Sequence, residues 1–183
     1  DGTALTDSGY TYTDGILVAG DVLTAVVEGT ITNVGTAANV VTSYVVMRGT
    51  VDVTGNYTFG TSVDGVLAIT ARPVTLTSAT DSKVYDGTAL TNATVTVGGD
   101  GFASGEGADY TVTGSQLDVG SSDNSFTYTL TGGALAANYT ITKTEGTLTV
   151  TPITDEIVIT ADSDSKVYDG TALTDSGYTY TDG

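Results

Sequence analysis

The stretch DSKVYDGTALT at residues 81–91 recurs without a change at residues 164–174. A longer stretch, DGTALTDSGYTYTDG, occurs both at residues 1–15 and at residues 169–183. The offset of the second pair is about twice that of the first, so one long period contains two shorter ones. Self-similarity at a fixed period is the sequence signature of a chain built from serial copies of one structural unit. This repeat decides how the rest of the sequence is interpreted.

The segments between the identical stretches also align, more weakly but in the same order. The matching pairs are Asn33-Val34-Gly35 with Asp118-Val119-Gly120, NYTF at 56–59 with NYTI at 138–141, and GVLAIT at 65–70 with GTLTVT at 146–151. Order that is kept across whole segments indicates diverged copies of one domain rather than one recurring tag.

The alignment predicts three units. Module A covers residues 1–72 and lacks its opening strand, which we expect from preceding sequence or from a neighbouring copy. Module B covers residues 73–152 and is complete, and module C, residues 153–183, is the start of the next module A. The only prolines, Pro73 and Pro152, fall at the two boundaries, where a residue without a backbone donor interrupts a sheet ladder at low cost. The chain is therefore expected to be a window on a longer array.

The composition predicts an all-β fold. Threonine, valine and tyrosine are abundant, 24 residues are glycine, and β-branched and aromatic side chains favour strands while glycine favours turns. Residues 125–131 (SFTYTLT) alternate apolar and polar side chains, as expected for an antiparallel sheet with one buried face. Residues 138–143 and 146–151 flank Thr144-Glu145 and predict a tight hairpin. No segment has a helical period.

Six or seven short strands in each module favour small Ig-like β-sandwiches arranged end to end. A β-grasp-like sheet is the alternative, but it needs a helix for which the sequence gives no signal. The link between modules A and B, Thr70-Ala71-Arg72, has no flexible spacer. Neighbouring modules should therefore be stiffly coupled.

The charge and the missing residue types exclude several functions. Twenty-two acidic and five basic residues give a net charge of −17, with no histidine and no cysteine. Disulfides, thiolate nucleophiles, zinc sites built on Cys or His and imidazole catalysis are therefore excluded. Nucleic acid and anionic membranes are not expected as partners, because their phosphates are bound by lysine and arginine. A glycosidase needs only two carboxylates, but nearly all distinctive residues recur at each period, so no enzyme is predicted.

The sequence resembles a known family. The KVYDGT stretch, the Asn-Val-Gly segment, Gly-Asn-Tyr-Thr at residues 55–58 and the closing Gly-x-Leu-x-Ile/Val-Thr segment are similar to the glycine-rich, mostly-β MBG or YDG-type tandem repeats of bacterial surface proteins. The resemblance covers the whole chain. It implies a segment of a large, secreted or wall-attached, adhesin-like protein and does not identify a binding partner.

The repeated KVYDGT stretch is interpreted as a structural turn rather than a ligand site. Asp-Gly supplies the positive φ that a tight turn needs, and the valine and tyrosine before it can pack at the core edge. The residues assigned to this role are Lys83, Tyr85, Asp86 and Gly87, repeated at Lys166, Tyr168, Asp169 and Gly170.

A second structural set is the Asn-Tyr pair of each module, Asn56-Tyr57 and Asn138-Tyr139. An isopeptide bond would suit a fibre without cysteine, and Lys83 with Asn138 is the one pair to test in module B. Lys166 would pair with the equivalent of Asn56 in the next module. The favoured interpretation is an exposed lysine and an asparagine in a turn.

Two ligand hypotheses remain open at this stage. Calcium could bind the densest acidic cluster, Asp162-Ser163-Asp164 with Asp155-Glu156, although no EF-hand-like loop is present and solvated surface charge is favoured. No other cofactor is predicted. Tyr10 and Tyr12, repeated as Tyr178 and Tyr180, could stack on sugars, but alternating Tyr-Thr is also ordinary sheet stabilisation.

The sequence as a whole predicts a stiff spacer, a stalk or fibre segment of a long extracellular bacterial surface protein. Its partners would be adjacent copies of the repeat, and lateral self-association is a further option. One alternative is a module that binds a glycan or a host protein by avidity. Another is a filament that assembles by strand donation between chains, which pairing of residues 157–160 within their own chain would argue against.

Overall fold

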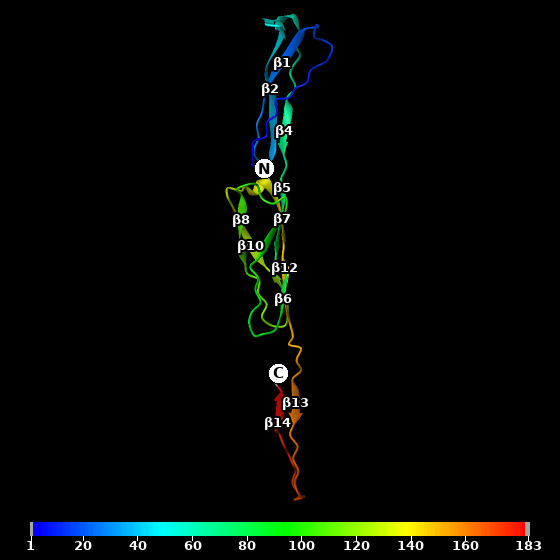
Figure 1. The fold of residues 1–183 in the computed structure, drawn as a ribbon, viewed down its shortest axis with the longest axis vertical. Helices are drawn as coiled ribbons and strands as arrows, with labels where there is room; N and C mark the ends of the chain where they lie inside the picture. Colours follow the sequence, from blue (N-terminus) through cyan, green and yellow to red (C-terminus); the bar gives the residue numbers. More distant parts are fainter. Residues whose placement is uncertain (1, 182–183) are drawn as a thin grey trace.

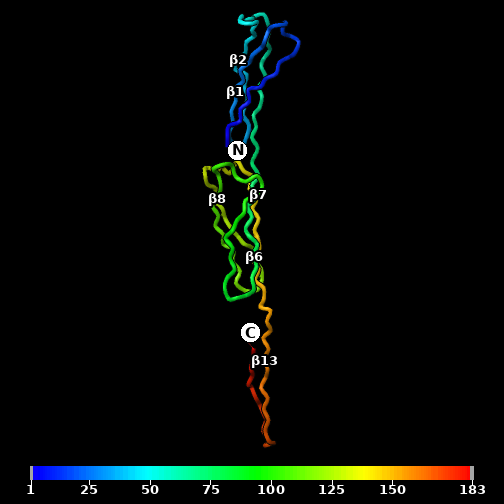
Figure 2. The backbone as a smooth tube through the Cα atoms, in the orientation of Figure 1, coloured from blue at the N-terminus to red at the C-terminus, as the bar shows by residue number. Residues whose placement is uncertain are grey.

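The computed structural model describes residues 2–181 as an elongated chain of β-structure (Figure 1). The backbone trace shows three parts in a row, with the C-terminal segment at the end opposite module A (Figure 2). No α-helix occurs in residues 2–181; the helical turns there are two short 3-10 segments, η1 (Thr54–Asn56) and η2 (Ala136–Asn138). The predicted all-β class is confirmed. Within the same range, no helix is long and apolar enough to span a membrane.

Module A is organised around one long strand. Strand β2 (Gly35–Arg48) pairs antiparallel with β1 (Asp21–Glu28) along most of its length and with the short β3 (Val51–Asp52) at its end. The first five residues of β2 pair with β4 (Gly65–Ile69). Strand β4 then leads through two residues into the first strand of module B, so the chain crosses the boundary without a loop.

Module B contains three small sheets. The first has the order β11-β5-β7, the second β6-β12-β9, and the third is the pair β10-β8. The strands are β5 (Arg72–Ser78), β6 (Asp81–Val84), β7 (Val95–Gly99), β8 (Gly107–Val112), β9 (Gly120–Asn124), β10 (Phe126–Thr131), β11 (Tyr139–Thr144) and β12 (Gly146–Thr151).

The predicted hairpin around Thr144-Glu145 is wrong. Strands β11 and β12 do not pair with each other; β11 runs parallel to β5, and β12 lies between β6 and β9. They form one extended segment that passes from one sheet to the next, as β5 and β6 do. A two-residue hairpin turn needs positive φ, and no residue other than glycine has positive φ in the part of the chain described.

The core of module B lies between the first and third sheets. Val74 and Leu76 of β5, Phe126 of β10 and Tyr139 of β11 form one buried cluster, with Tyr110 of β8 packed against it. The predicted alternation in residues 125–131 is confirmed at Phe126, which is 1% exposed, but is wrong at Tyr128, which is 37% exposed. Strand β10 pairs antiparallel with β8, as expected. A second cluster, Leu90, Leu148 and Val150, fills the other end of the module.

Module C, the start of the next module A, has the same strand pairing as the start of module B. Strand β13 (Val158–Ala161) pairs antiparallel with β14 (Tyr178–Thr181), with Val158 opposite Thr181. The residues that align with this pair in module B are Thr75 of β5 and Gly98 of β7, and they also lie opposite each other. The two strand pairs therefore have the same register. The pairing of β13 lies within one chain, which argues against a filament built by strand donation.

The prolines lie close to the predicted boundaries. Pro73 is the second residue of β5, before that strand begins to pair with β7 at Val74, and Pro152 directly follows β12. Pro152 therefore lies outside a ladder, and Pro73, which lies opposite Thr140 of β11, is near the end of one, where a missing N–H costs little. Strand β5 thus begins at Arg72, one residue before the predicted start of module B.

Candidate functional site

The KVYDGT stretch forms a compact turn closed by its own lysine. Lys83 Nζ donates to Asp86 Oδ1 at 2.6 Å, to Thr88 O at 2.5 Å and to Thr88 Oγ1 at 2.8 Å. Asp86 Oδ1 also accepts the backbone N–H of Thr88 at 2.9 Å, and Gly87 between them has φ +78°. The Lys83 ammonium, followed by the Thr88 donors, holds the pKa of the Asp86 carboxyl well below its ordinary value.

The second copy of the stretch builds the same turn. Lys166 Nζ reaches Asp169 Oδ1 at 2.9 Å and Thr171 Oγ1 at 2.6 Å, and Gly170 has φ +77°. Lys166 also holds the pKa of Asp169 below its ordinary value. The tyrosine is the main difference: Tyr168 is 93% exposed, whereas Tyr85 is 38% exposed and donates its backbone N–H to Thr151 O.

These contacts leave the turn little capacity for a ligand. An ammonium group has three donors, and Lys83 has three acceptors within its own turn. The geometry is that of a self-closed structural turn, as the sequence interpretation proposes for Lys83, Asp86 and Gly87.

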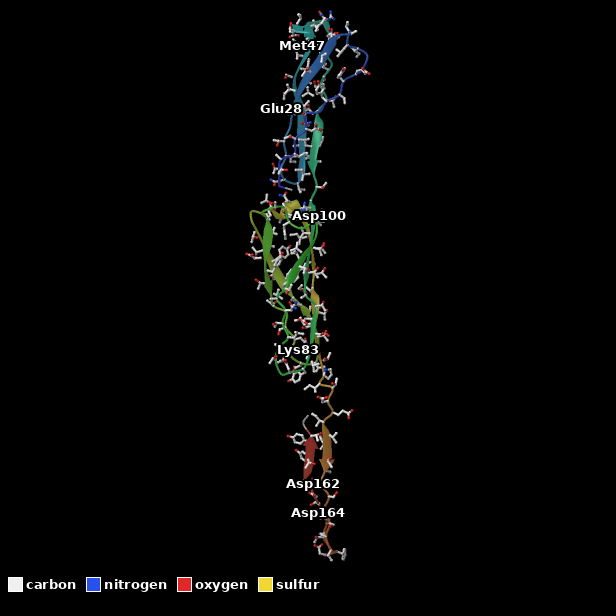
Figure 3. All side chains as sticks on the ribbon, viewed as in Figure 1. Glu28, Met47, Lys83, Asp100, Asp162 and Asp164 are labelled. Carbon is white, nitrogen blue, oxygen red and sulfur yellow. The ribbon has the colours of Figure 1, made fainter. Side chains whose placement is uncertain are left out.

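Lys83 and Asn138 are not brought together, so the pair considered for an isopeptide bond is separated. Lys83 is paired opposite Val150 in the second sheet, and Tyr139 lies opposite Arg72 in the first. The extended chain between Tyr139 and Val150 spans roughly 35 Å. In Figure 3 Lys83 lies at the end of module B toward module C.

Asn138 lies instead at the junction between modules A and B. Its Oδ1 accepts the backbone N–H of Val34 at 3.0 Å, and its Nδ2 donates to Asn33 Oδ1 at 3.0 Å. Arg72 and Tyr139 help to line a cavity of about 100 Å³ beside these contacts. The side chain of Asn138 therefore connects module B to the loop before β2 of module A.

The two tyrosines of the Asn-Tyr pairs have equivalent roles. Tyr139 donates to Glu106 and accepts the N–H of Ala103 at 3.0 Å. Burial, and then the bond to Glu106, raise the pKa of Tyr139. In module A, Tyr57 donates to Asp21 Oδ2 at 2.6 Å and accepts the N–H of Val18 at 3.0 Å. Asn56 ends η1 and donates its backbone N–H to Val53 O.

Sequence reasoning missed an ion pair beside Tyr57. Arg48 binds Asp21 through two nitrogens, at 2.5 Å and 2.9 Å, and the Asp21 side chain is only 1% exposed. Arg48, followed by Tyr57, lowers the pKa of Asp21. The repeat gave no signal for this pair, because glycine occupies the position in module B that aligns with Arg48.

A buried asparagine was also missed. Asn124, 0% exposed, donates through Nδ2 to Ala79 O and Asn92 O, each at 2.9 Å. Its counterpart Asn39 donates to Asp7 O at 2.9 Å. The offset that relates residues 1–6 to residues 86–91 also relates Asn39 to Asn124, so closer attention to the alignment would have found them.

The acidic cluster of module C does not assemble. Among the described residues, no group of three or more carboxylates is placed to hold a metal ion. Asp162 and Asp164 lie after β13 on an extended segment at the end of the molecule away from module A (Figure 3). The structure therefore does not gather the residues considered for calcium.

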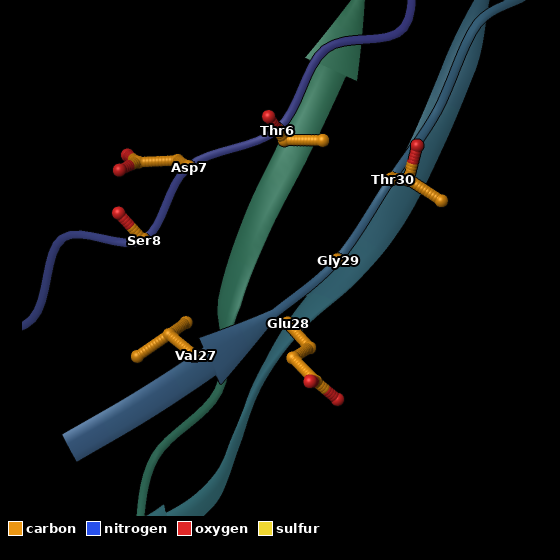
Figure 4. Close-up of a pocket in the computed structure, with 7 residues that line it drawn as sticks. All are labelled: Thr6, Asp7, Ser8, Val27, Glu28, Gly29 and Thr30. Carbon is orange, nitrogen blue, oxygen red and sulfur yellow. The ribbon is translucent and has the colours of Figure 1, made fainter.

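One open groove of module A contains two carboxylates, Asp7 and Glu28, beside Gly29. Their side chains point away from each other in Figure 4, and Asp7 Oδ1 accepts the N–H of Gly9 at 2.7 Å. Glycoside hydrolysis needs two carboxyl groups on opposite sides of one bond, an arrangement that these two side chains do not form.

A second groove in module A, of about 610 Å³, is rich in aromatic side chains. We call it the module A groove. It is lined by two segments, residues 10–13 and 57–63, which we call its walls, and by side chains that include Leu23, Ala25 and Val41. Tyr44 stacks on Phe59 with ring centroids 4.3 Å apart. The two tyrosines considered for sugar binding, Tyr10 and Tyr12, both line this groove, while Tyr178 and Tyr180 lie on the exposed strand β14.

Comparison with known proteins gives one match. No curated protein and no solved structure matches the chain. The family model of the YDG domain matches residues 70–146, a range that begins between β4 and β5 and ends at the first residue of β12. The YDG part of the resemblance is thereby confirmed for this segment: residues 70–146 carry the sequence pattern of a YDG domain.

Proposed function

We propose that the chain is a segment of a stiff molecular spacer, a stalk or fibre in a long repetitive protein of the bacterial surface. The observation that carries the proposal is the register that β13–β14 and β5–β7 share in successive copies of the repeat. A repeat that rebuilds the same strand pairing is expected to continue as a row of equivalent domains. In such a row the number of repeats determines the length of the spacer.

The junction supports stiffness. Two residues separate β4 from β5, so there is no length of chain in which a flexible linker could form. Asn138 adds two hydrogen bonds from module B to module A. We infer that successive modules are small β-sandwiches joined end to end, each restricted in bending by the strand that enters it and by this asparagine.

The surface is suited to a long extracellular thread. A net charge of −17 makes neighbouring threads repel one another and keeps them soluble. Five basic residues in the whole chain leave few sites for proteases that cleave after lysine or arginine. Because the chain has no cysteine, its stability does not depend on the redox state of the surroundings.

Electron microscopy of chains with one, two and four copies of the long repeat, residues 1–168, tests this proposal. The expected result is a single thread whose contour length increases by a constant increment per copy. Collapse of the four-copy chain into a compact particle would refute the spacer. Glycan-array binding that strengthens with copy number would instead favour a binding module acting by avidity.

A further inference from the structure

The module A groove corresponds in position to the place that β5 occupies in module B. In the alignment of the two modules, residues 10–14, on one wall, match β7 (Val95–Gly99). Residues 57–62, on the other wall, match β11 (Tyr139–Thr144). Strand β5 lies between β7 and β11 and pairs with both. Among residues 2–181, no strand of module A pairs with either wall.

The local structure of the walls reflects this difference. The aligned sequences are strands in module B, whereas residues 10–13 and 57–63 have no strand assignment in module A. A strand forms when its backbone donors and acceptors find partners, and in module B β5 supplies those partners to both neighbours. The walls of the groove therefore have the sequence of sheet strands and lack the strand that would pair with them.

Two further positions of module A, Gly65 and Asn39, also indicate that a strand equivalent to β5 is missing. A Cβ on Gly146 would lie 2.3 Å from Ala79 O, at the break between β5 and β6, whereas at the matching Gly65 the nearest atom is Asn39 Cβ at 3.5 Å. Likewise Asn124 donates to both Asn92 O and Ala79 O, whereas Asn39 makes only the first of these two bonds within residues 2–181, to the aligned Asp7 O. Gly65 and Asn39 therefore leave room for a backbone segment like the one that passes Gly146 and Asn124 in module B.

We propose that the module A groove is the docking site for an extended segment with the sequence of residues 155–168, supplied by the preceding copy of the repeat in the same chain. Residues 169–183 repeat residues 1–15. Because residues 155–168 directly precede this second copy, a continuing repeat would place the same sequence directly before module A. This inference rests on the proposed tandem array. It adds that the strand which leaves each module B completes the core of the module that follows.

The side chains of this segment fit the groove. Ile157 and Ile159 align with Val74 and Leu76 when residues 164–174 are matched to residues 81–91. The two isoleucines are 70% and 69% exposed, whereas Val74 and Leu76 are 1% and 0% exposed. Burying two isoleucines against apolar side chains of the groove is favourable. Strand β13 pairs with β14 along one edge, and an apolar strand with a free edge is otherwise prone to aggregation.

Each module has an arginine near the matching carboxylate, Arg72 near Glu106 in module B and Arg48 at Asp21 in module A. Arg72, the first residue of β5, and Glu106 both line the small junction cavity, and the residue that aligns with Arg72 in the proposed segment is Asp155. Module A has its own cation at the matching carboxylate, since Arg48 binds Asp21. The incoming segment therefore does not need to carry a positive charge.

Three proteins test the assignment: the chain of residues 1–183, the same chain with residues 153–168 added directly before Asp1, and a matched control with the added Ile157 and Ile159 both changed to aspartate. Amide hydrogen exchange is measured for residues 10–13 and 57–62. We expect protection to rise about 100-fold in the extended chain and to stay unchanged in the control. Unchanged protection in the extended chain would overturn the proposal.

A fluorescently labelled synthetic peptide of residues 153–168 gives a second readout. It should bind the chain of residues 1–183 and should not bind the extended chain, in which the groove is already filled. If the shorter chain forms a dimer and the extended chain does not, the groove binds a second molecule instead, and the proposal is wrong. Binding of a glycan to the groove of the extended chain would also overturn the proposal. Hydrogen exchange and peptide binding report only on the module A groove. The docking proposal can therefore fail while the contour length of the array still increases with copy number.

Discussion

Leu76 and Ile159 occupy the same position in successive copies of the repeat but differ completely in burial. Leu76 on β5 is 0% exposed in the core of module B, and Ile159 on β13 is 69% exposed. Changing each residue to alanine therefore measures how much of module stability depends on a strand buried between two neighbours. Leu76→Ala is expected to destabilise module B strongly, and Ile159→Ala is expected to have little effect.

The magnitude follows from the atoms removed. Leu76→Ala deletes three buried carbon groups, each worth about 0.8 kcal/mol of transfer free energy, and the cavity left beside Phe126 and Tyr139 adds about 1–2 kcal/mol. The free energy of unfolding of module B should fall by about 3–4 kcal/mol. For a domain of this size, this lowers the melting temperature by about 15 °C or more. Ile159→Ala should cost less than about 0.5 kcal/mol.

Hydrogen exchange measured peptide by peptide, together with far-UV circular dichroism during heating, distinguishes these outcomes. In Leu76→Ala, protection should decrease in β5, β10 and β11 and remain in β1 and β2 of module A. The conservative variant Leu76→Met should cost less than about 1.5 kcal/mol, so it reports on the site even if the alanine variant does not fold. Equal effects of Leu76→Ala and Ile159→Ala would refute the assignment of β5 as the central strand of a packed core.

Three further predictions concern the polar contacts. Lys83→Met removes the main cause of the low pKa of Asp86, so NMR titration of the Asp86 carboxyl carbon should show a pKa closer to the ordinary 3.8; an unchanged pKa would contradict the role of Lys83. Asn138→Ala removes the bond to Val34 and should broaden the distribution of angles between modules A and B in solution scattering, while the melting temperature of each module changes little. Asp21 has a pKa lowered from the ordinary 3.8, so its contribution to stability is present above pH 3.8 and is lost as the pH falls through the lowered value; Asp21→Asn should reduce stability at neutral pH and flatten the acid unfolding of module A followed by circular dichroism.

The repeat and the alternating residues were enough to predict the strand class and the buried position of Phe126. Tyr128, on the same predicted face, is 37% exposed. The first two predictions succeed because the side-chain period of a strand is visible in the sequence. The pairing of strands is not visible in the same way, and for this reason the hairpin at Thr144-Glu145 was wrong: consecutive strands in a long extended segment can join different sheets.

The site was predictable to a smaller extent. The turn at Lys83 and Asp86 follows from local chemistry, whereas the contact of Asn138 with Val34 joins residues far apart in the sequence and depends on how two modules meet. Residues 57–62 align with strand β11 but form no strand in module A, because strand formation depends on a neighbour as well as on propensity. The ion pair between Arg48 and Asp21 was missed because it is present in only one of the two module types.

The distance across the A–B junction tests the central claim most directly. The chain has no cysteine, so Ser43→Cys on β2 and Thr127→Cys on β10, both at exposed positions, give two spin labels in an otherwise unlabelled protein. The account predicts one narrow distribution of label distances in pulsed dipolar spectroscopy, centred on the separation in the structure. A broad distribution that extends to short distances would mean that the modules bend freely, and the chain would then not be a stiff spacer.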